Sequence, residues 1–180
     1  MPSLFLCPDD SLWQPPDVDA FARRMRDLGL TQSPSPSGSA HEYSAGEEFV
    51  KLVMFLGCSP QVVVDPAGAA DGQAACAVRL VEFSEPALLA SHPLPAARCR
   101  KCRAPVSLPA SFEADAQYNG GHCGNRSPLG RLDWRQGAGY GCFFVELGAI
   151  YPHEAVPSDK LLLELQAISC CKWTYFYAHR

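Results

Sequence analysis

The cysteines between residues 99 and 124 have the spacing of metal ligands. Cys99 and Cys102 form a Cys-x-x-Cys turn, and Cys123 lies in a second turn whose sequence, over 120–124, is Gly-Gly-His-Cys-Gly. A Cys-x-x-Cys turn lets two thiolates bind one tetrahedral Zn²⁺, and a second such turn completes a four-ligand structural site. The sequence therefore predicts a zinc site with three clear sulfur ligands.

Residues 99–124 resemble a zinc ribbon, a family of small modules in which two such turns each carry a β-hairpin. The resemblance implies that the metal acts as the core, because so short a segment buries too little apolar surface to fold alone. The three cysteines match the family's ligand positions, but Gly120 stands where the fourth cysteine belongs, and His122 and His92 are the nearby nitrogen donors. Two alternatives stay open: a ribbon that binds zinc, and one that keeps its hairpins without metal. The metal ligands predicted for the first are Cys99, Cys102, Cys123 and His122.

Four cations surround the first turn: Arg98, Arg100, Lys101 and Arg103. Positive charge stabilises thiolates, which favours both zinc ligation and thiol redox chemistry. A redox Cys-x-x-Cys opens a helix, whereas Pro105 opposes a helix here, so zinc ligation is the stronger interpretation. Contact with nucleic acid through the same four side chains is a further alternative.

Catalytic candidates elsewhere in the chain are sparse. Glu146 lies in an apolar run, and a buried carboxylate there needs a partner or a raised pKa. Together with His153 and Glu154 it could serve a small metal-dependent enzyme, although this spacing matches no ligand pattern. The final aromatic run, 173–177, is predicted to lie in a strand at a sheet edge, either packing in the core or contacting a partner.

The composition excludes several classes of protein. Of 180 residues, 47% are hydrophobic and 19% charged, which is too apolar for a disordered chain, and no apolar run is long enough to span a membrane. The net charge of -4 argues against a general nucleic-acid binder. The first residues lack the features of a signal peptide, and nine cysteines without secretion predict a reducing cytoplasm.

The rest of the chain alternates strand and helix signals. Apolar runs predict strands at 4–7, 61–65, 75–83, 131–135, 142–147 and 172–178, with a helix as the alternative for 142–147. Helices are predicted over 18–28, from a capping box at Ser44 through Leu56, and over 159–168. Residues 31–43 and 84–97 are predicted loops, and 61–65 is predicted to form a hairpin with 75–83. This order predicts an α+β fold with a mixed or antiparallel sheet and about three helices, in which 1–98 and 125–180 make one domain and 99–124 is an insert.

These observations favour a non-enzymatic protein-interaction module in the cytoplasm. Its acidic balance suits an inhibitor or immunity-type protein that masks a basic partner by electrostatic complementarity. The sequence identifies neither that partner nor the oligomeric state. The small metal-dependent enzyme and the nucleic-acid accessory protein are the alternatives.

Overall fold

The computed structural model describes residues 1–34, 40–57, 63, 75–108, 116–120 and 122–179. Its strands are β1 Pro2–Pro8, β2 Thr31–Pro34, β3 Glu42–Ala45, β4 Val53–Phe55, β5 Ala77–Ala90, β6 Tyr118–Asn119, β7 Arg126–Ser127, β8 Ala138–Gly148, β9 Ala155–Pro157 and β10 Trp173–His179. Its helices are α1 Val18–Asp27, α2 Phe49–Leu52 and α3 Asp159–Ser169, with a short 3-10 turn, η2, at Leu129–Arg131.

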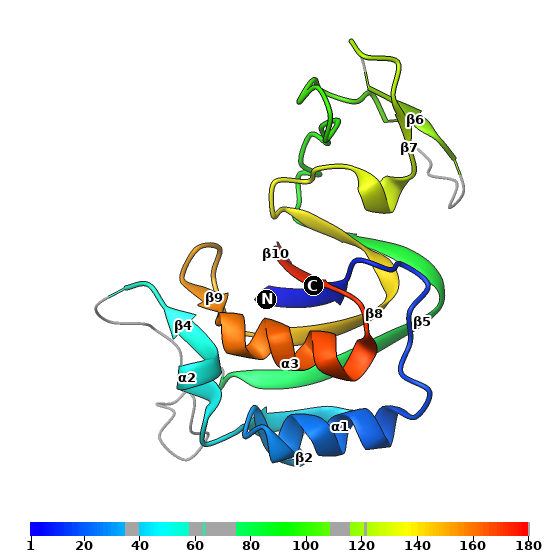
Figure 1. Ribbon diagram of the computed structural model, residues 1–180. Helices are drawn as coiled ribbons and strands as arrows, with labels where there is room; N and C mark the ends of the chain where they lie inside the picture. Colours follow the sequence, from blue (N-terminus) through cyan, green and yellow to red (C-terminus); the bar gives the residue numbers. More distant parts are fainter. Residues whose placement is uncertain (35–39, 58–62, 64–74, 109–115, 121, 180) are drawn as a thin grey trace.

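A six-stranded sheet in the order β10-β1-β8-β5-β3-β2 forms the body of the molecule. Every neighbouring pair in it is antiparallel, which confirms the predicted α+β class. The long strands β5 and β8 pair in two runs separated by an irregularity between Glu82 and Ala87. Such irregularities bend a strand and increase its twist. The two strands accordingly curl over β1 and β10 (Figure 1).

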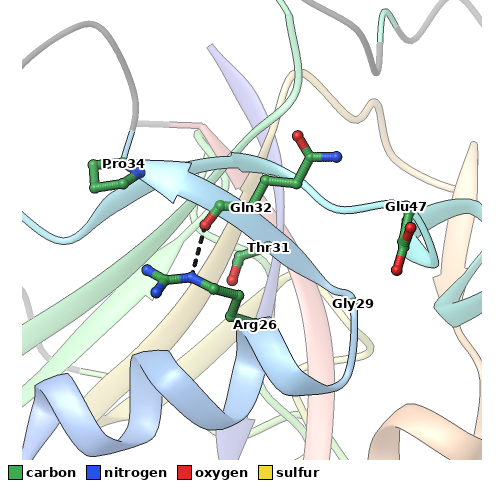
Figure 2. Close-up of a pocket in the computed structure, with 6 residues that line it drawn as sticks. All are labelled: Arg26, Gly29, Thr31, Gln32, Pro34 and Glu47. Carbon is green, nitrogen blue, oxygen red and sulfur yellow. Dashed lines mark hydrogen bonds between the residues drawn. The ribbon is translucent and has the colours of Figure 1, made fainter.

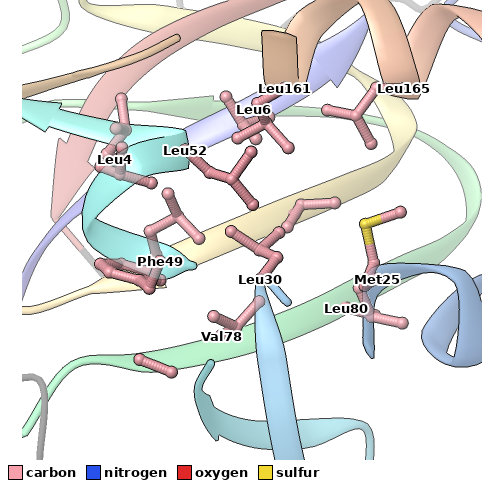
Figure 3. Packing of buried hydrophobic residues seen from close by; sticks show 14 of the residues in the cluster. Leu4, Leu6, Met25, Leu30, Phe49, Leu52, Val78, Leu80, Leu161 and Leu165 are labelled. Carbon is pink, nitrogen blue, oxygen red and sulfur yellow. The ribbon is translucent and has the colours of Figure 1, made fainter. Parts of the chain in front are cut away.

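The helices α1 and α3 cover one face of this sheet, and each begins at a residue whose side chain caps it. Asp17 accepts a hydrogen bond from the Ala20 N–H at 2.9 Å and begins α1, and Ser158 accepts from the Leu161 N–H at 3.2 Å and begins α3. Apolar side chains from both helices meet those of the sheet in the largest core (Figure 3). Its labelled members are Leu4, Leu6, Met25, Leu30, Phe49, Leu52, Val78, Leu80, Leu161 and Leu165.

The opposite face carries a second, aromatic core inside the curl. Phe5 and Phe176 stack with ring centroids 5.2 Å apart, and the Phe144 ring meets the Phe176 ring edge-on at 6.0 Å. A Cβ on Gly139 would lie 2.1 Å from the Phe176 ring. Only glycine therefore lets the start of β8 close against β10.

Two predictions for the N-terminal half of the chain are wrong: the helix from Ser44 through Leu56 and the loop over 31–43. Ser44 is not a helix cap but lies in β3, and α2 has four residues with no side-chain cap at Glu48. A helix this short is marginal, and the chain passes directly into β4, whose pairing with β9 replaces the predicted second half of the helix. The predicted loop 31–43 contains β2 and the start of β3, because Pro34 is tolerated at the outer edge of the sheet.

Three further predictions need correction. Residues 131–135 form no strand: η2 occupies Leu129–Arg131, and Asp133 makes only an isolated bridge to Arg98. The strand predicted at 75–83 continues to Ala90, so the predicted loop 84–97 begins later. Of 61–65 only Val63 is described, and it bridges Ala75 in a parallel direction, unlike the predicted hairpin. The rest of that segment lies outside the described residues.

The final strand is confirmed at the sheet edge. Trp173, Phe176 and Tyr177 are buried, so this aromatic run packs in the core rather than presenting an open face. None of the helices in the described part of the chain has the length and apolarity needed to cross a bilayer.

Candidate metal centre

The described residues of 97–138, which are 97–108, 116–120 and 122–138, form a small unit, the cysteine module, that continues from the curled ends of β5 and β8 (Figure 1). The module has a core separate from those of the sheet, and the indole N–H of Trp134 donates to the Leu129 carbonyl at 3.1 Å within it. The buried members of this core are Ala97, Cys99, Val106, Tyr118, Leu129, Leu132, Trp134 and Ala138. One of the three cysteines is thus a core residue of the module.

The two cysteine turns have matching backbones. The Cys99 N–H donates to the Ala104 carbonyl at 3.0 Å, and the Gly120 N–H donates to the Asn125 carbonyl at 2.7 Å. The residue after the last cysteine of each turn is left-handed: Arg103 has a φ of 62° and Gly124 a φ of 64°. Gly120 therefore occupies in the second turn the position that Cys99 occupies in the first.

Strand pairing supports both turns. β6 and β7 pair antiparallel on either side of the second turn, with Tyr118 opposite Ser127. An antiparallel bridge between Arg98 and Pro105 closes the first turn. Each turn is thereby held at its base, which fixes the direction in which its cysteines point.

The three cysteine sulfurs converge on one point. The Sγ atoms of Cys99, Cys102 and Cys123 all lie within 4.8 Å of one another, and Cys99 Sγ is 3.7 Å from Cys123 Sγ. Sulfurs bound at about 2.3 Å to one tetrahedral zinc lie about 3.8 Å apart. The cluster could hold a metal ion, and the donor set fits zinc.

Gly120 faces this cluster at close range. A Cβ at this position would lie 2.7 Å from the Cys99 Sγ and 3.2 Å from the Cys123 Sγ. There is therefore no room for a side chain at residue 120 beside the sulfurs as they lie, and a fourth cysteine at this position would require them to shift.

Backbone N–H groups lower the pKa of one of the three thiols, Cys99, and so favour its thiolate, the form that binds metal. The N–H groups of Cys102 and Lys101 lower the pKa of Cys99 to about 7. The Asn125 N–H acts in the same direction on Cys123, but the neighbouring sulfurs and burial outweigh it and raise the Cys123 pKa. Without metal, the Cys99 thiol therefore ionises more readily than an ordinary cysteine.

The predicted nitrogen ligands lie at the surface. His122 and His92 are exposed, and neither belongs to the cluster formed by the described residues. Ligation by His122 stays a prediction. The structure brings together the three predicted sulfurs, with the two less buried ones, Cys102 and Cys123, toward solvent.

The cations of the first turn divide into two pairs. Arg98 Nη1 donates to the Arg103 carbonyl at 3.3 Å, and the Arg103 guanidinium lies 3.6 Å from the Asp133 carboxylate. Arg100 and Lys101 are exposed. Two of the four cations are thus occupied within the module.

Glu146 has the partner that its buried position requires. Its side chain is 1% exposed, and its Oε1 accepts from the Ser3 hydroxyl at 2.9 Å and lies 3.3 Å from Arg79 Nη1. Arg79 also donates to the Glu42 carboxylate on the next strand. Burial alone would lower the pKa of Arg79, but its hydrogen bond to Glu42 and the charge of Glu146 raise it. The three charged side chains of Glu42, Arg79 and Glu146 lie on the neighbouring strands β3, β5 and β8 and form an ionic row, which the Ser3 hydroxyl extends to β1.

The other two enzyme candidates lie across the sheet from Glu146. Glu146 is opposite Phe5 in register, on the face of the aromatic core, whereas the His153 ring lies 5.2 Å from Tyr177, which belongs to the core under the helices. Glu154 accepts the Tyr151 N–H at 3.0 Å. The structure therefore does not bring Glu146 and His153 together.

Two core thiols give the fold a pH-dependent stability. Burial raises the pKa of Cys7 to about 12 and that of Cys76 to about 12, from 9.0. Between pH 9 and about pH 12 the unfolded chain binds fewer protons than the folded one. The contribution of the two thiols to the free energy of unfolding is therefore fully present below pH 9 and falls as the pH rises. Each thiol removes about 1.4 kcal/mol per pH unit in that window.

Urea unfolding at pH 8, 9 and 10 measures this dependence. Cys76→Ala costs stability at every pH but is expected to flatten the decline above pH 9. If the free energy of unfolding of Cys76→Ala falls with pH as steeply as that of the unmodified chain, Cys76 does not contribute to the pH dependence.

A depression lies beside α1 (Figure 2). It has a volume of about 510 Å³ and is lined by Arg26, Gly29, Thr31, Gln32, Pro34 and Glu47. Arg26 Nε already donates to the Gln32 carbonyl at 3.1 Å, which occupies its cationic group. The lining gathers no catalytic or metal-binding set.

The fold and the site define an α+β protein with a three-cysteine cluster that could hold a metal ion. No family model, curated protein or solved structure matches the chain. Its function is therefore argued from its own residues.

Proposed function

We propose that this chain is a zinc-binding, non-enzymatic interaction protein that uses the cysteine module to dock on another protein. The observation that carries the proposal is the convergence of three cysteine sulfurs within 4.8 Å inside a module with its own small core. Metal ligation supplies the stability that such a small core lacks. Zinc held by three sulfurs leaves a fourth tetrahedral position for a ligand from outside the cluster.

The proposed partner is basic, and the chain acts as an inhibitor or immunity-type protein that masks it. A groove of about 830 Å³ separates the cysteine module from the main sheet. It is lined by three carboxylates, Asp9, Asp10 and Glu85, and by one cation, Arg131. A basic segment bound in this groove would pair with the carboxylates of Asp9, Asp10 and Glu85 on the side of the sheet. On its other side the same segment would contact the cysteine module.

A reducing cytoplasm is the proposed location. All eight cysteines among the described residues are free thiols, as expected where disulfides do not form. Zinc ligation requires the same conditions, because a thiolate bound in a disulfide is lost as a ligand.

The two alternatives have less support. A metal-dependent enzyme needs Glu146 near His153, and these lie on opposite faces of the sheet. A nucleic-acid role for the first turn would rely on Arg100 and Lys101, because Arg98 and Arg103 are engaged within the module.

The test is a tagged pull-down from native cells without chelator, with partner identification and zinc content measured on the same eluate. We expect one zinc per chain and a stoichiometric basic partner. The double variant Asp9→Asn, Glu85→Gln keeps side-chain size, removes two charges from the groove, and is expected to release the partner while retaining zinc. Recovery of the chain alone, or a partner held equally by the variant, would contradict the proposal.

A further inference from the structure

A second groove lies between the cysteine module and β10, and it carries the opposite charge. Its volume is about 350 Å³, within the size range of small-molecule sites. Residues of the module and of the sheet line this groove. They include four cations and two tyrosines: Arg100, Arg131, Arg135, Lys172, Tyr140 and Tyr175.

The four cations reach this groove from four separate segments. Arg100 belongs to the first cysteine turn, Arg131 to η2, Arg135 to the turn before β8, and Lys172 to the approach to β10. None of them forms a salt bridge with a carboxylate within the described part of the chain. Gathering unpaired like charges is unfavourable, and an anion bound between them would relieve their repulsion.

The carboxylates of the same groove do not neutralise this charge. Asp9 and Asp133 also line it, but Asp133 lies 3.6 Å from the Arg103 guanidinium and accepts the Arg135 N–H at 3.0 Å. One of the two acids is therefore already engaged, and the groove keeps an excess of positive charge.

The backbone that presents Arg135 is strained and firmly held. Arg135 and Gln136 have left-handed φ angles of 53° and 62°, which cost non-glycine residues about 1 kcal/mol or more each. The turn is closed by the Gly137 N–H to the Trp134 carbonyl at 3.0 Å, and the Gln136 carbonyl accepts the Tyr177 N–H of β10 at 2.9 Å. These bonds fix Arg135 at the groove despite the strain.

Aromatic side chains complete the lining. Tyr140 is half-buried at the groove and packs against the core of the module. Trp134, Trp173 and Tyr175 also contribute to the lining, but the Trp173 indole and the Tyr175 ring pack toward the core under the helices. A planar ring stacks on tyrosine while a phosphate attached to it pairs with arginine in a bidentate geometry. We propose that this groove binds a small free nucleotide, with its phosphate among the four cations and its base against Tyr140.

Tryptophan fluorescence tests the proposal, because two of the three tryptophans of the chain line the groove. The full chain is titrated with AMP, with adenosine and with inorganic phosphate. We expect AMP to bind at least about tenfold more tightly than either fragment, since only AMP provides both the ring and the charge.

Arg135→Asn is the decisive variant, because asparagine tolerates a left-handed φ but carries no charge. It is expected to weaken AMP binding by about tenfold or more, whereas Arg135→Lys retains part of the affinity. Arg24→Ala, an exposed arginine on α1, is the matched control and is expected to leave AMP binding unchanged. Zinc content measured on each sample shows whether the module is intact.

Three results would overturn the proposal. One is equal AMP affinity in Arg135→Asn and Arg24→Ala, and another is inorganic phosphate binding as tightly as AMP. The third is a single-stranded oligonucleotide binding far more tightly than AMP, which would assign the groove to a nucleic-acid strand instead of a free nucleotide.

Discussion

Replacing Cys99 with serine is expected to abolish zinc binding and unfold the cysteine module. Cys99 is 1% exposed, belongs to the core of the module, and has the pKa that favours its thiolate. Removing even a hydrogen-bond partner of a metal ligand weakens binding by about 10–100-fold, so loss of the ligand itself is expected to exceed that. Structural zinc contributes about 10–16 kcal/mol in small zinc peptides, which is more than a core of this size supplies.

The measurement combines metal content with hydrogen exchange of individual amides. Amides of the module, such as those of Cys99 and Gly120, are expected to lose protection in Cys99→Ser, while β1 and β8 keep theirs because their cores are separate. Cys170→Ser is the matched control, since Cys170 is exposed and outside the cluster. A wild-type chain that folds with protected module amides and no zinc would instead favour the ribbon that keeps its hairpins without metal.

The zinc-ligand pattern illustrates what short-range sequence signals can predict. The spacing of Cys99 and Cys102 predicts a turn that presents both sulfurs to one point, and the structure has such a turn. Gly120 was predictable as the missing ligand position for the same reason. The lack of room for a side chain at residue 120 beside the Cys99 sulfur was not predictable, because it depends on how two turns distant in sequence pack together.

Local signals failed where tertiary pairing decided the outcome. Asp17 and Ser158 cap long amphipathic helices that are buried on one face, and their predictions are confirmed. Ser44 begins a capping box with Glu47, yet it lies in β3, because pairing with β2 and β5 outweighs a weak local preference. The cationic groove was likewise beyond sequence reasoning, since Arg100 and Lys172 meet only after the module folds against the sheet.

The ionic row provides the second large prediction. Glu146→Ala is expected to destabilise the fold by about 1–3 kcal/mol, because it leaves the buried Ser3 hydroxyl without its acceptor and removes one of the two carboxylates that face Arg79, which keeps Glu42. Glu146 is 1% exposed, and it meets both Ser3 and Arg79. In a chain of this size that loss lowers Tm by about 2–12 °C.

Two further variants separate the charge from its surroundings. Glu146→Gln keeps an oxygen that can accept from Ser3 but loses the charge facing Arg79, so its cost is expected to lie below that of Glu146→Ala. Glu48→Ala breaks an exposed pair with Lys51, whose atoms are 2.7 Å apart, and is expected to cost at most about 1 kcal/mol. Thermal unfolding of the three variants should rank them in that order. If Glu146→Ala is no more costly than Glu48→Ala, the row does not stabilise the sheet, and burial of Glu146 needs another explanation.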